Sequence, residues 1–280
     1  MSEMKRTLCE GLPRLGLTLT ETTCDTLCAF GEAVVEQNKV MNLTAITEPD
    51  QVAKLHLLDS LSILAVKDLR GKKMVDVGCG AGFPGVPVKI ACPEVELTLL
   101  DSLGKRMNWL ETILPQLGVE ANCVTARAEE AVATCRERYD VATSRAVARL
   151  NVLLELTAPF VKVGGFVLAM KGTAAMEELE EAKKAIKILG LKLEEVREFP
   201  VDGTAHTVIV LKKVAPTPRN TPDGLPRSSR LPYKKISRWA FAHRLFVMLR
   251  FLFLLPQQPF WQPVCSQTDP RDHGAGRPLP

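Results

Sequence analysis

Residues 75–85 read Val-Asp-Val-Gly-Cys-Gly-Ala-Gly-Phe-Pro-Gly, and this stretch decides the fold. An apolar run of the β type, Met74–Val77, leads directly into a glycine-rich turn. Further along the chain a second such run, Val95–Leu100, ends in Asp101. A strand, a glycine turn, a helix and a second strand ending in a carboxylate form the nucleotide-binding half of a doubly wound α/β fold.

The glycine turn predicts a ligand that comes close to the backbone. Glycine adopts positive φ and has no Cβ, so it permits both a tight turn and a close approach. The spacing here is G-x-G-x-G, whereas a dinucleotide site uses G-x-G-x-x-G. Asp76 stands just before the turn, where a carboxylate would repel a pyrophosphate and suits a ligand with a cationic amino-acid end. These features favour S-adenosylmethionine over NAD, and a tight turn without a ligand is the alternative.

Asp101 is placed to bind the sugar of such a ligand. It ends the second strand, where a carboxylate can accept hydrogen bonds from both ribose hydroxyls. On this physical argument we expect Gly80, Gly82 and Asp101 to contact the cofactor.

Strands and helices alternate after residue 71, which predicts a mainly parallel sheet covered by helices. Strands are expected near Met74–Val77, Val95–Leu100, Ala121–Val124, Tyr139–Ser144, Phe166–Met170, Leu193–Phe199 and Thr207–Leu211. Helices are expected near Pro87–Ala91, Lys105–Leu117, Glu129–Cys135, Arg149–Pro159 and Ala175–Leu189. The last two strands would form a hairpin that inserts one antiparallel strand. The predicted class is therefore α/β, a Rossmann-like seven-stranded S-adenosylmethionine-dependent methyltransferase fold with N-terminal helices.

The chain divides into three expected parts. Residues 1–70 show apolar residues at helical spacing, with a break at Asn38–Thr44, and should pack on the core. Residues 71–213 form the expected methyltransferase domain, and residues 214–280 read as a Pro-rich basic linker and an atypical tail of disordered composition. The apolar stretch 239–255 is interrupted by arginines and too short for a membrane span, although a membrane-surface helix is an alternative.

Composition and charge limit the function classes. The net charge is +4, but residues 214–280 carry ten Lys/Arg and three Asp/Glu, so the main body is slightly acidic. Global charge therefore gives no argument for nucleic acid, which must rest on local placement. The eight cysteines are scattered without zinc-site spacing, and no apolar h-region follows the N-terminus. We expect a cytoplasmic protein with reduced cysteines and no metal.

A series of short motifs runs in order from about residue 30 to residue 213. They are Asn38–Thr44, His56–Leu61, Asp76–Gly85, Leu99–Arg106, Ala126–Glu129, Thr143–Ala148 and Met170–Gly172. Together they resemble the ribosomal RNA small subunit methyltransferase G family, also called glucose-inhibited division protein B. Residues 221–227 are close to the T-P-x-x-[FY]-P-R segment near which members usually end, and beyond Arg227 the resemblance fades.

The resemblance implies an S-adenosylmethionine-dependent enzyme that methylates N7 of one guanine in bacterial 16S ribosomal RNA. It also implies cofactor contacts at Gly78, Phe83, Ala128, Glu129 and Arg145. The expected partner is 16S ribosomal RNA or the small ribosomal subunit. We expect a monomer without stable membrane association.

The sequence offers no obvious catalytic dyad, and this chemistry needs none. N7 of guanine carries a lone pair and no proton, so proximity and alignment with the sulfonium methyl can supply catalysis. The catalytic residues are thus unknown. Arg149 and Lys171 are candidate RNA contacts at the rim where the strands end, and Arg106, which opens a helix, is a third candidate. Each has a solvated charge as its alternative. His56 and Asp59 share a helical face and fit a structural hydrogen bond or an RNA contact equally, while His206 fits a structural role.

Two other functions fit parts of this pattern. A nicotinamide-dependent oxidoreductase would share the fold, but the glycine spacing and the missing hydride-transfer residues count against it. A non-catalytic RNA-binding assembly factor with a cofactor fold is the other. The glycine turn, Asp101 and Arg145 are all present, which argues against this alternative, because a non-catalytic protein would not need an intact cofactor site.

Overall fold

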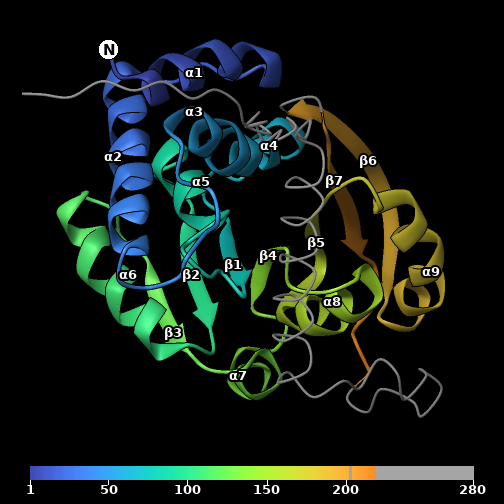
Figure 1. The fold of residues 1–280 in the computed structure, drawn as a ribbon. Helices are drawn as coiled ribbons and strands as arrows, with labels where there is room; N and C mark the ends of the chain where they lie inside the picture. The colour runs from blue at the N-terminus through green and yellow to red at the C-terminus, as the bar shows by residue number, and fades with distance from the viewer. Residues whose placement is uncertain (202–203, 219–280) are drawn as a thin grey trace, which may run out of the picture. The chain divides into compact units, whose positions relative to one another are not determined.

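The computed structural model describes residues 1–201 and 204–218, and Figure 1 shows their arrangement. One seven-stranded sheet has the order β3-β2-β1-β4-β5-β7-β6. Its strands are β1 (Lys73–Val77), β2 (Glu96–Asp101), β3 (Asn122–Thr125), β4 (Tyr139–Arg145), β5 (Val161–Lys171), β6 (Leu191–Val201) and β7 (Thr204–Lys213). Strands β1 to β5 pair in parallel, and β7 is antiparallel to both β5 and β6. The predicted topology, with its inserted antiparallel strand, is confirmed.

The helices also lie close to their predicted positions. They are α1 (Glu3–Gly11), α2 (Glu21–Asn38), α3 (Pro49–Val52), α4 (Asp59–Val66), α5 (Gly85–Ala91), α6 (Gly104–Gln116), α7 (Ala128–Cys135), α8 (Leu150–Thr157) and α9 (Ala175–Ile188). Short 3₁₀ turns occupy Leu12–Leu15 and Ala158–Phe160, and a π-helical turn, Ala53–Leu58, joins α3 to α4. The predicted break after α2 is present, because the Asn38 side chain accepts hydrogen bonds from the backbone of Leu43 and Thr44.

Strand β5 begins earlier than the sequence predicted. The strand was expected near Phe166–Met170, but it starts at Val161 and runs through Gly164 and Gly165. A Cβ at Gly165 would lie 2.3 Å from the backbone oxygen of Asp140 on β4. The glycine is therefore needed for close approach of two strands, which is a known use of glycine inside a sheet.

Helices cover both faces of the sheet. Alternate residues of a strand point to opposite faces. Met74 and Leu99 accordingly join a hydrophobic cluster with helices α1 to α6, whereas Val75 and Leu100 join a second cluster with α7 to α9. Figure 1 shows the two groups of helices apart from one another. Helices α1 to α4 contribute residues to the first cluster. Among them, α4 contacts α5, β6 and β7, so the N-terminal helices pack on the methyltransferase-type core.

The last described residues are anchored by hydrogen bonds near the amino ends of the parallel strands. The buried Lys213 ammonium donates to the Ala158 carbonyl at 3.0 Å and to the Thr217 hydroxyl. The Thr217 N–H in turn donates to Glu137 at 2.8 Å. The predictions for the linker after Pro218, the apolar stretch and the tail lie outside the described residues. Within residues 1–201 and 204–218, none of the helices combines the length and apolar character of a membrane span.

Candidate cofactor site

Three groups predicted to bind the cofactor lie together at the carboxyl ends of the parallel strands. Val77 pairs with Leu100 across β1 and β2, so the glycine loop after β1 lies beside Asp101. On the other side of β1, the Ser144 hydroxyl donates to the Val77 carbonyl at 2.7 Å. The end of β4, with Arg145, therefore adjoins the same loop. Open α/β sheets bind ligands at this kind of position, where the strand order reverses.

The three glycines of the loop all have positive φ, but their surroundings differ. The φ values are +72° at Gly78, +59° at Gly80 and +95° at Gly82. A Cβ at Gly78 would lie 2.6 Å from Val147, and one at Gly82 would lie 2.8 Å from Val86. At Gly80 the nearest heavy atom is an Arg106 nitrogen 3.9 Å away. With respect to the described residues, Gly80 thus faces open space that a ligand can enter, whereas Gly78 and Gly82 permit close packing of the protein itself.

Asp101 holds the loop against β2. Its buried carboxylate accepts hydrogen bonds from the Gly80 N–H at 3.0 Å and the Leu103 N–H at 2.9 Å. An Arg106 nitrogen lies 3.9 Å from the same carboxylate. Each carboxylate oxygen has two lone pairs, so Asp101 retains acceptor sites for ribose hydroxyls.

Asp76 is more deeply buried than the sequence indicated. One of its oxygens accepts the Gly85 N–H at 2.8 Å, and the other, Oδ1, has no hydrogen-bond partner among the described residues. Burial raises the pKa of Asp76 from its ordinary 3.8 to about 7. With this pKa, the carboxyl is partly protonated near pH 7 while no ligand is bound. A cationic group arriving at Oδ1 would favour the ionised form.

Arg145 and Phe83 form the other side of the site. The Arg145 guanidinium carbon lies 5.1 Å from the centre of the Phe83 ring. Phe83 also contacts Phe30 at 5.2 Å and stacks on His56 at 4.7 Å between ring centres. The side chain of Arg145 is 17% exposed, so part of it remains accessible to a ligand. The N-terminal helices, through Phe30 and His56, are thereby joined to the glycine loop.

Ala128 and Glu129 open helix α7, close to Asp101. The loop before them is fixed because the Ala126 N–H donates to the Asp101 carbonyl at 3.1 Å. Glu129 is exposed and Ala128 is half-buried. Together with the open position at Gly80, the free lone pairs of Asp101 and the unpartnered Asp76 oxygen, these residues fit S-adenosylmethionine, with its cationic amino-acid end, ribose and adenine.

The three candidate RNA contacts have different surroundings. Arg106 is 25% exposed beside the glycine loop. Arg149 is 38% exposed and pairs with Glu177 at 3.0 Å and Glu181 at 2.7 Å, which neutralises much of its charge. Both remain predicted RNA contacts.

Lys171 differs from what the sequence suggested, because it is buried. Its ammonium pairs with Glu178 at 2.8 Å and donates to the Ala148 carbonyl, leaving 7% of the side chain exposed. Burial lowers the pKa of Lys171. The structure therefore gives this residue a structural ion pair in place of a rim position open to phosphate.

Sequence reasoning left the role of one group of residues open. Asp59 and His206 lie far apart in the chain, yet they contact one another, and Asp59 also pairs with Arg145. The sequence signal that was available is the motif His56–Leu61, for which a structural hydrogen bond and an RNA contact were equally open. Only the fold brings β7 next to α4.

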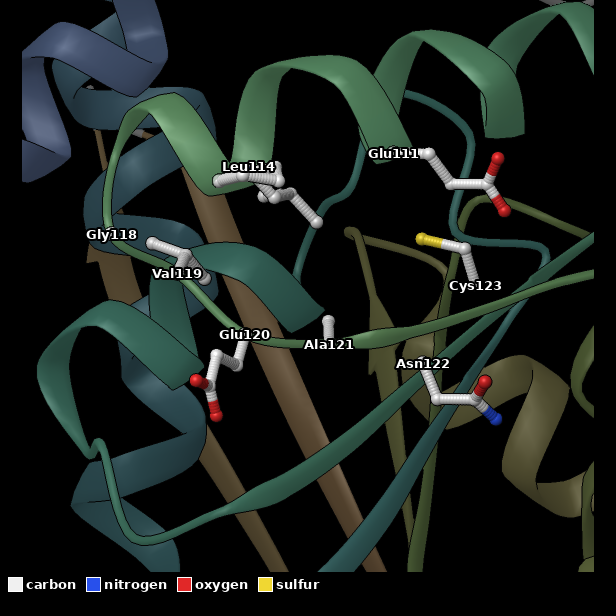
Figure 2. A pocket seen from close by; sticks show the side chains of 9 residues that line it. Glu111, Leu114, Gly118, Val119, Glu120, Ala121, Asn122 and Cys123 are labelled. Atoms are coloured by element: carbon white, nitrogen blue, oxygen red, sulfur yellow. The ribbon is translucent and has the colours of Figure 1, made fainter.

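A separate hollow of about 610 Å³ lies between the end of α6 and strand β3. Figure 2 shows Glu111 and Leu114 on α6 and Asn122 and Cys123 on β3 lining it. None of the lining residues is a predicted cofactor contact. This hollow is therefore distinct from the site at the glycine loop.

Comparison with known proteins identifies the family to which the chain is similar. A sequence model of the family described as rRNA small subunit methyltransferase G matches residues 23–206. Ribosomal RNA small subunit methyltransferase G of Alkaliphilus oremlandii is 44% identical over 238 residues, covering 83% of this chain and 100% of that protein. The corresponding protein of Alkaliphilus metalliredigens is 42% identical over 239 residues, covering 83% and 98%. Among solved structures, TrmN from Thermus thermophilus is similar with 19% identity and a TM-score of 0.45, covering 56% of this chain and 48% of that one.

Proposed function

The chain belongs to the rRNA small subunit methyltransferase G family, and we propose that it transfers a methyl group from S-adenosylmethionine to N7 of one guanine in 16S ribosomal RNA. The observation that carries the cofactor part of the proposal is the open face of Gly80 beside the Asp101 carboxylate, at the edge where the strands end. A nicotinamide-dependent oxidoreductase and a non-catalytic assembly factor are not favoured by this membership.

Different residues of the site are proposed to bind different parts of the cofactor. Asp101 accepts from the ribose hydroxyls, and the backbone at Gly80 leaves room for the adenosyl group, while Gly78 and Gly82 let the turn pack closely against the protein around it. The Asp76 oxygen that has no partner in the described part of the chain suits the ammonium of the methionine part. Phe83, Ala128, Glu129 and Arg145 complete the site. When bound, the cofactor supplies a sulfonium-activated methyl group.

The protein contributes alignment to this reaction. N7 has a lone pair in the plane of the base and no proton, so no general base is required before attack. Effective molarities for well-aligned groups show that orientation alone lowers a barrier by about 7–11 kcal/mol. A site built from a rigid loop between β1 and α5, with a guanidinium fixed over an aromatic ring, provides such orientation. This is why the site needs no nucleophile–base pair.

Arg106 and Arg149 are the proposed contacts to the RNA backbone, both near the ends of the strands. The protein acts as a monomer in the cytoplasm under this proposal, and light scattering of the purified chain tests the monomer.

The function is tested by incubating small ribosomal subunits with the full chain and S-adenosylmethionine carrying a labelled methyl group. Mass spectrometry of the digested RNA should find the label in 7-methylguanosine and in no other nucleoside. Label on another atom or another base would refute the N7 assignment. Subunits with that guanine already methylated serve as the control and should take up no label.

A further inference from the structure

Arg145 is held by groups from the N-terminal helices, far from it in sequence. Its Nη1 donates to the Leu55 carbonyl at 3.0 Å and to Asp59 Oδ2 at 2.8 Å. The guanidinium also lies over the Phe83 ring. An arginine fixed by a carboxylate, a carbonyl and an aromatic face has one defined orientation.

Asp59 is itself held from a second direction. It is 4% exposed, and its other oxygen, Oδ1, lies 2.9 Å from His206 Nδ1 on strand β7. Burial alone would raise the pKa of Asp59, but the hydrogen bond from His206 and the charge of Arg145 outweigh it, and the pKa lies below its ordinary value. An ionised carboxylate only accepts, so His206 Nδ1 carries the proton. Asp59 is therefore a buried anion that bridges β4 and β7 to helix α4.

The backbone before Asp59 is adapted to this contact. Residues Ala53–Leu58 form a π-helical turn, and the Leu55 carbonyl within it accepts from Arg145. Single π-helical turns are rare and occur frequently at functional sites. His56, in the same turn, stacks on Phe83 and lies 2.7 Å from the Thr44 hydroxyl. The turn thus contacts both Arg145 and Phe83.

We propose that Asp59 and His206 are positioning residues that set the direction of the Arg145 guanidinium in the cofactor site. Helix α4 and strand β7 then support that site, although neither carries a predicted cofactor contact. The proposal rests on the proposed function and on its assignment of Arg145. Its physical basis is preorganisation: a long side chain that is already ordered loses less conformational freedom when the ligand binds.

The test measures S-adenosylmethionine affinity of full-length variants by calorimetry. Asp59→Asn keeps an acceptor oxygen but removes the charge, and we expect about tenfold to a hundredfold weaker binding, the range for hydrogen bonds to charged groups. In an Arg145→Gln background the same change should have less than about a twofold further effect, because the group that Asp59 orients is gone. A merely structural role would give the same effect in both backgrounds.

His206 gives an independent test that disturbs the core less, since its side chain is 22% exposed. His206→Leu removes the donor and should weaken binding about threefold to tenfold. His206→Asn keeps an N–H donor near the Nδ1 position and should restore most of the affinity. Equal losses in both variants would overturn the proposal.

Asp140→Asn is the matched control. Asp140 is also a largely buried carboxylate, paired with Lys162 at 2.6 Å, but it lies near the start of β4, away from the glycine loop. Its variant should bind S-adenosylmethionine like the wild type. If Arg145→Gln weakens binding and Asp59→Asn does not, the positioning role is wrong and the proposed function stands. If Arg145→Gln has no effect, the assignment of Arg145 fails and this inference fails with it. A chain that binds no S-adenosylmethionine refutes the proposed function.

Discussion

Two buried carboxylates flank the glycine loop, and their surroundings give them different properties. Asp101 accepts two backbone N–H groups, whereas Asp76 accepts one and has an oxygen without a partner among the described residues. Hydrogen bonds to the charged form offset the cost of burying a carboxylate, and Asp76 has too few of them. We therefore predict that a cationic ligand, when bound, determines the charge of Asp76.

Asp76 predicts a fall in stability with rising pH. Its folded pKa of about 7 lies above the ordinary value of 3.8, so between these values the folded chain holds a proton that the unfolded chain releases. Stability is then lost as the pH rises through this window, by up to about 4 kcal/mol for a shift of this size. Asp76→Asn should remove the loss.

Urea unfolding of wild type and Asp76→Asn without cofactor, at pH 4.5 and pH 8, checks this. The variant should gain stability relative to the wild type at the higher pH, since all other titrating groups are common to both chains. A difference that is the same at both pH values would mean that Asp76 is ionised throughout.

Gly80 predicts a loss of binding without a loss of fold. Gly80→Val places a branched side chain in the space where the adenosyl group meets the backbone and should abolish S-adenosylmethionine binding. Gly16 is the matched control, because its φ is +68° and a Cβ there would have no heavy atom within 4 Å, so Gly16→Val carries similar backbone strain. Both variants should lose a similar amount of thermal stability. Binding by Gly80→Val would place the cofactor elsewhere.

Among the elements, the sheet was predictable because its strands are apolar runs separated by turn residues. The start of β5 was missed, since the close approach of Gly165 to Asp140 depends on a neighbouring strand. The contacts of Asp59 with Arg145 and His206 were likewise out of reach, because they join an N-terminal helix to β4 and β7. Local patterns thus predicted the elements and the glycine loop, and tertiary contacts decided which charges are buried.

The ion pair of Lys171 on β5 with Glu178 on α9 predicts that its removal lowers stability without affecting RNA binding. Lys171→Met leaves the Glu178 carboxylate without its cation, and removal of one partner of a buried pair costs about 3–5 kcal/mol. The dependence of methyl transfer on salt concentration should be unchanged, because Lys171 is not available to phosphate. Chemical unfolding and a salt series of activity measure the two effects. If the Lys171→Met variant instead reduced the slope of log activity against log salt concentration by about one unit, Lys171 would be a phosphate contact.

For the whole molecule, we predict that the basic residues between Pro218 and Lys235 contribute to RNA binding at the site. Thr217 is fastened near the start of β4, whereas the cofactor site lies at the other end of that strand. A strand of this length spans about 20 Å, and an extended segment gains about 3.3 Å per residue. The basic linker that ends near Lys235 is therefore long enough to reach RNA bound at the site.

Truncation after Lys235 tests this division of the chain. We expect methyl transfer to small ribosomal subunits, and its salt dependence, to match the full chain, since the Pro-rich composition of the preceding linker predicts that the remaining residues are separate from the core. A further truncation after Pro218 should weaken RNA binding and reduce the salt slope. If the chain ending at Lys235 already loses activity while it still binds S-adenosylmethionine, the terminal residues belong to the RNA site.

The most direct test of the central claim is calorimetric titration of the full chain with S-adenosylmethionine and, separately, with NAD. A glycine loop open at Gly80, beside Asp101 and the partnerless Asp76 oxygen, predicts saturable binding of one S-adenosylmethionine per chain and no binding of NAD. Binding of NAD in place of S-adenosylmethionine would contradict the account, and so would the absence of binding by either.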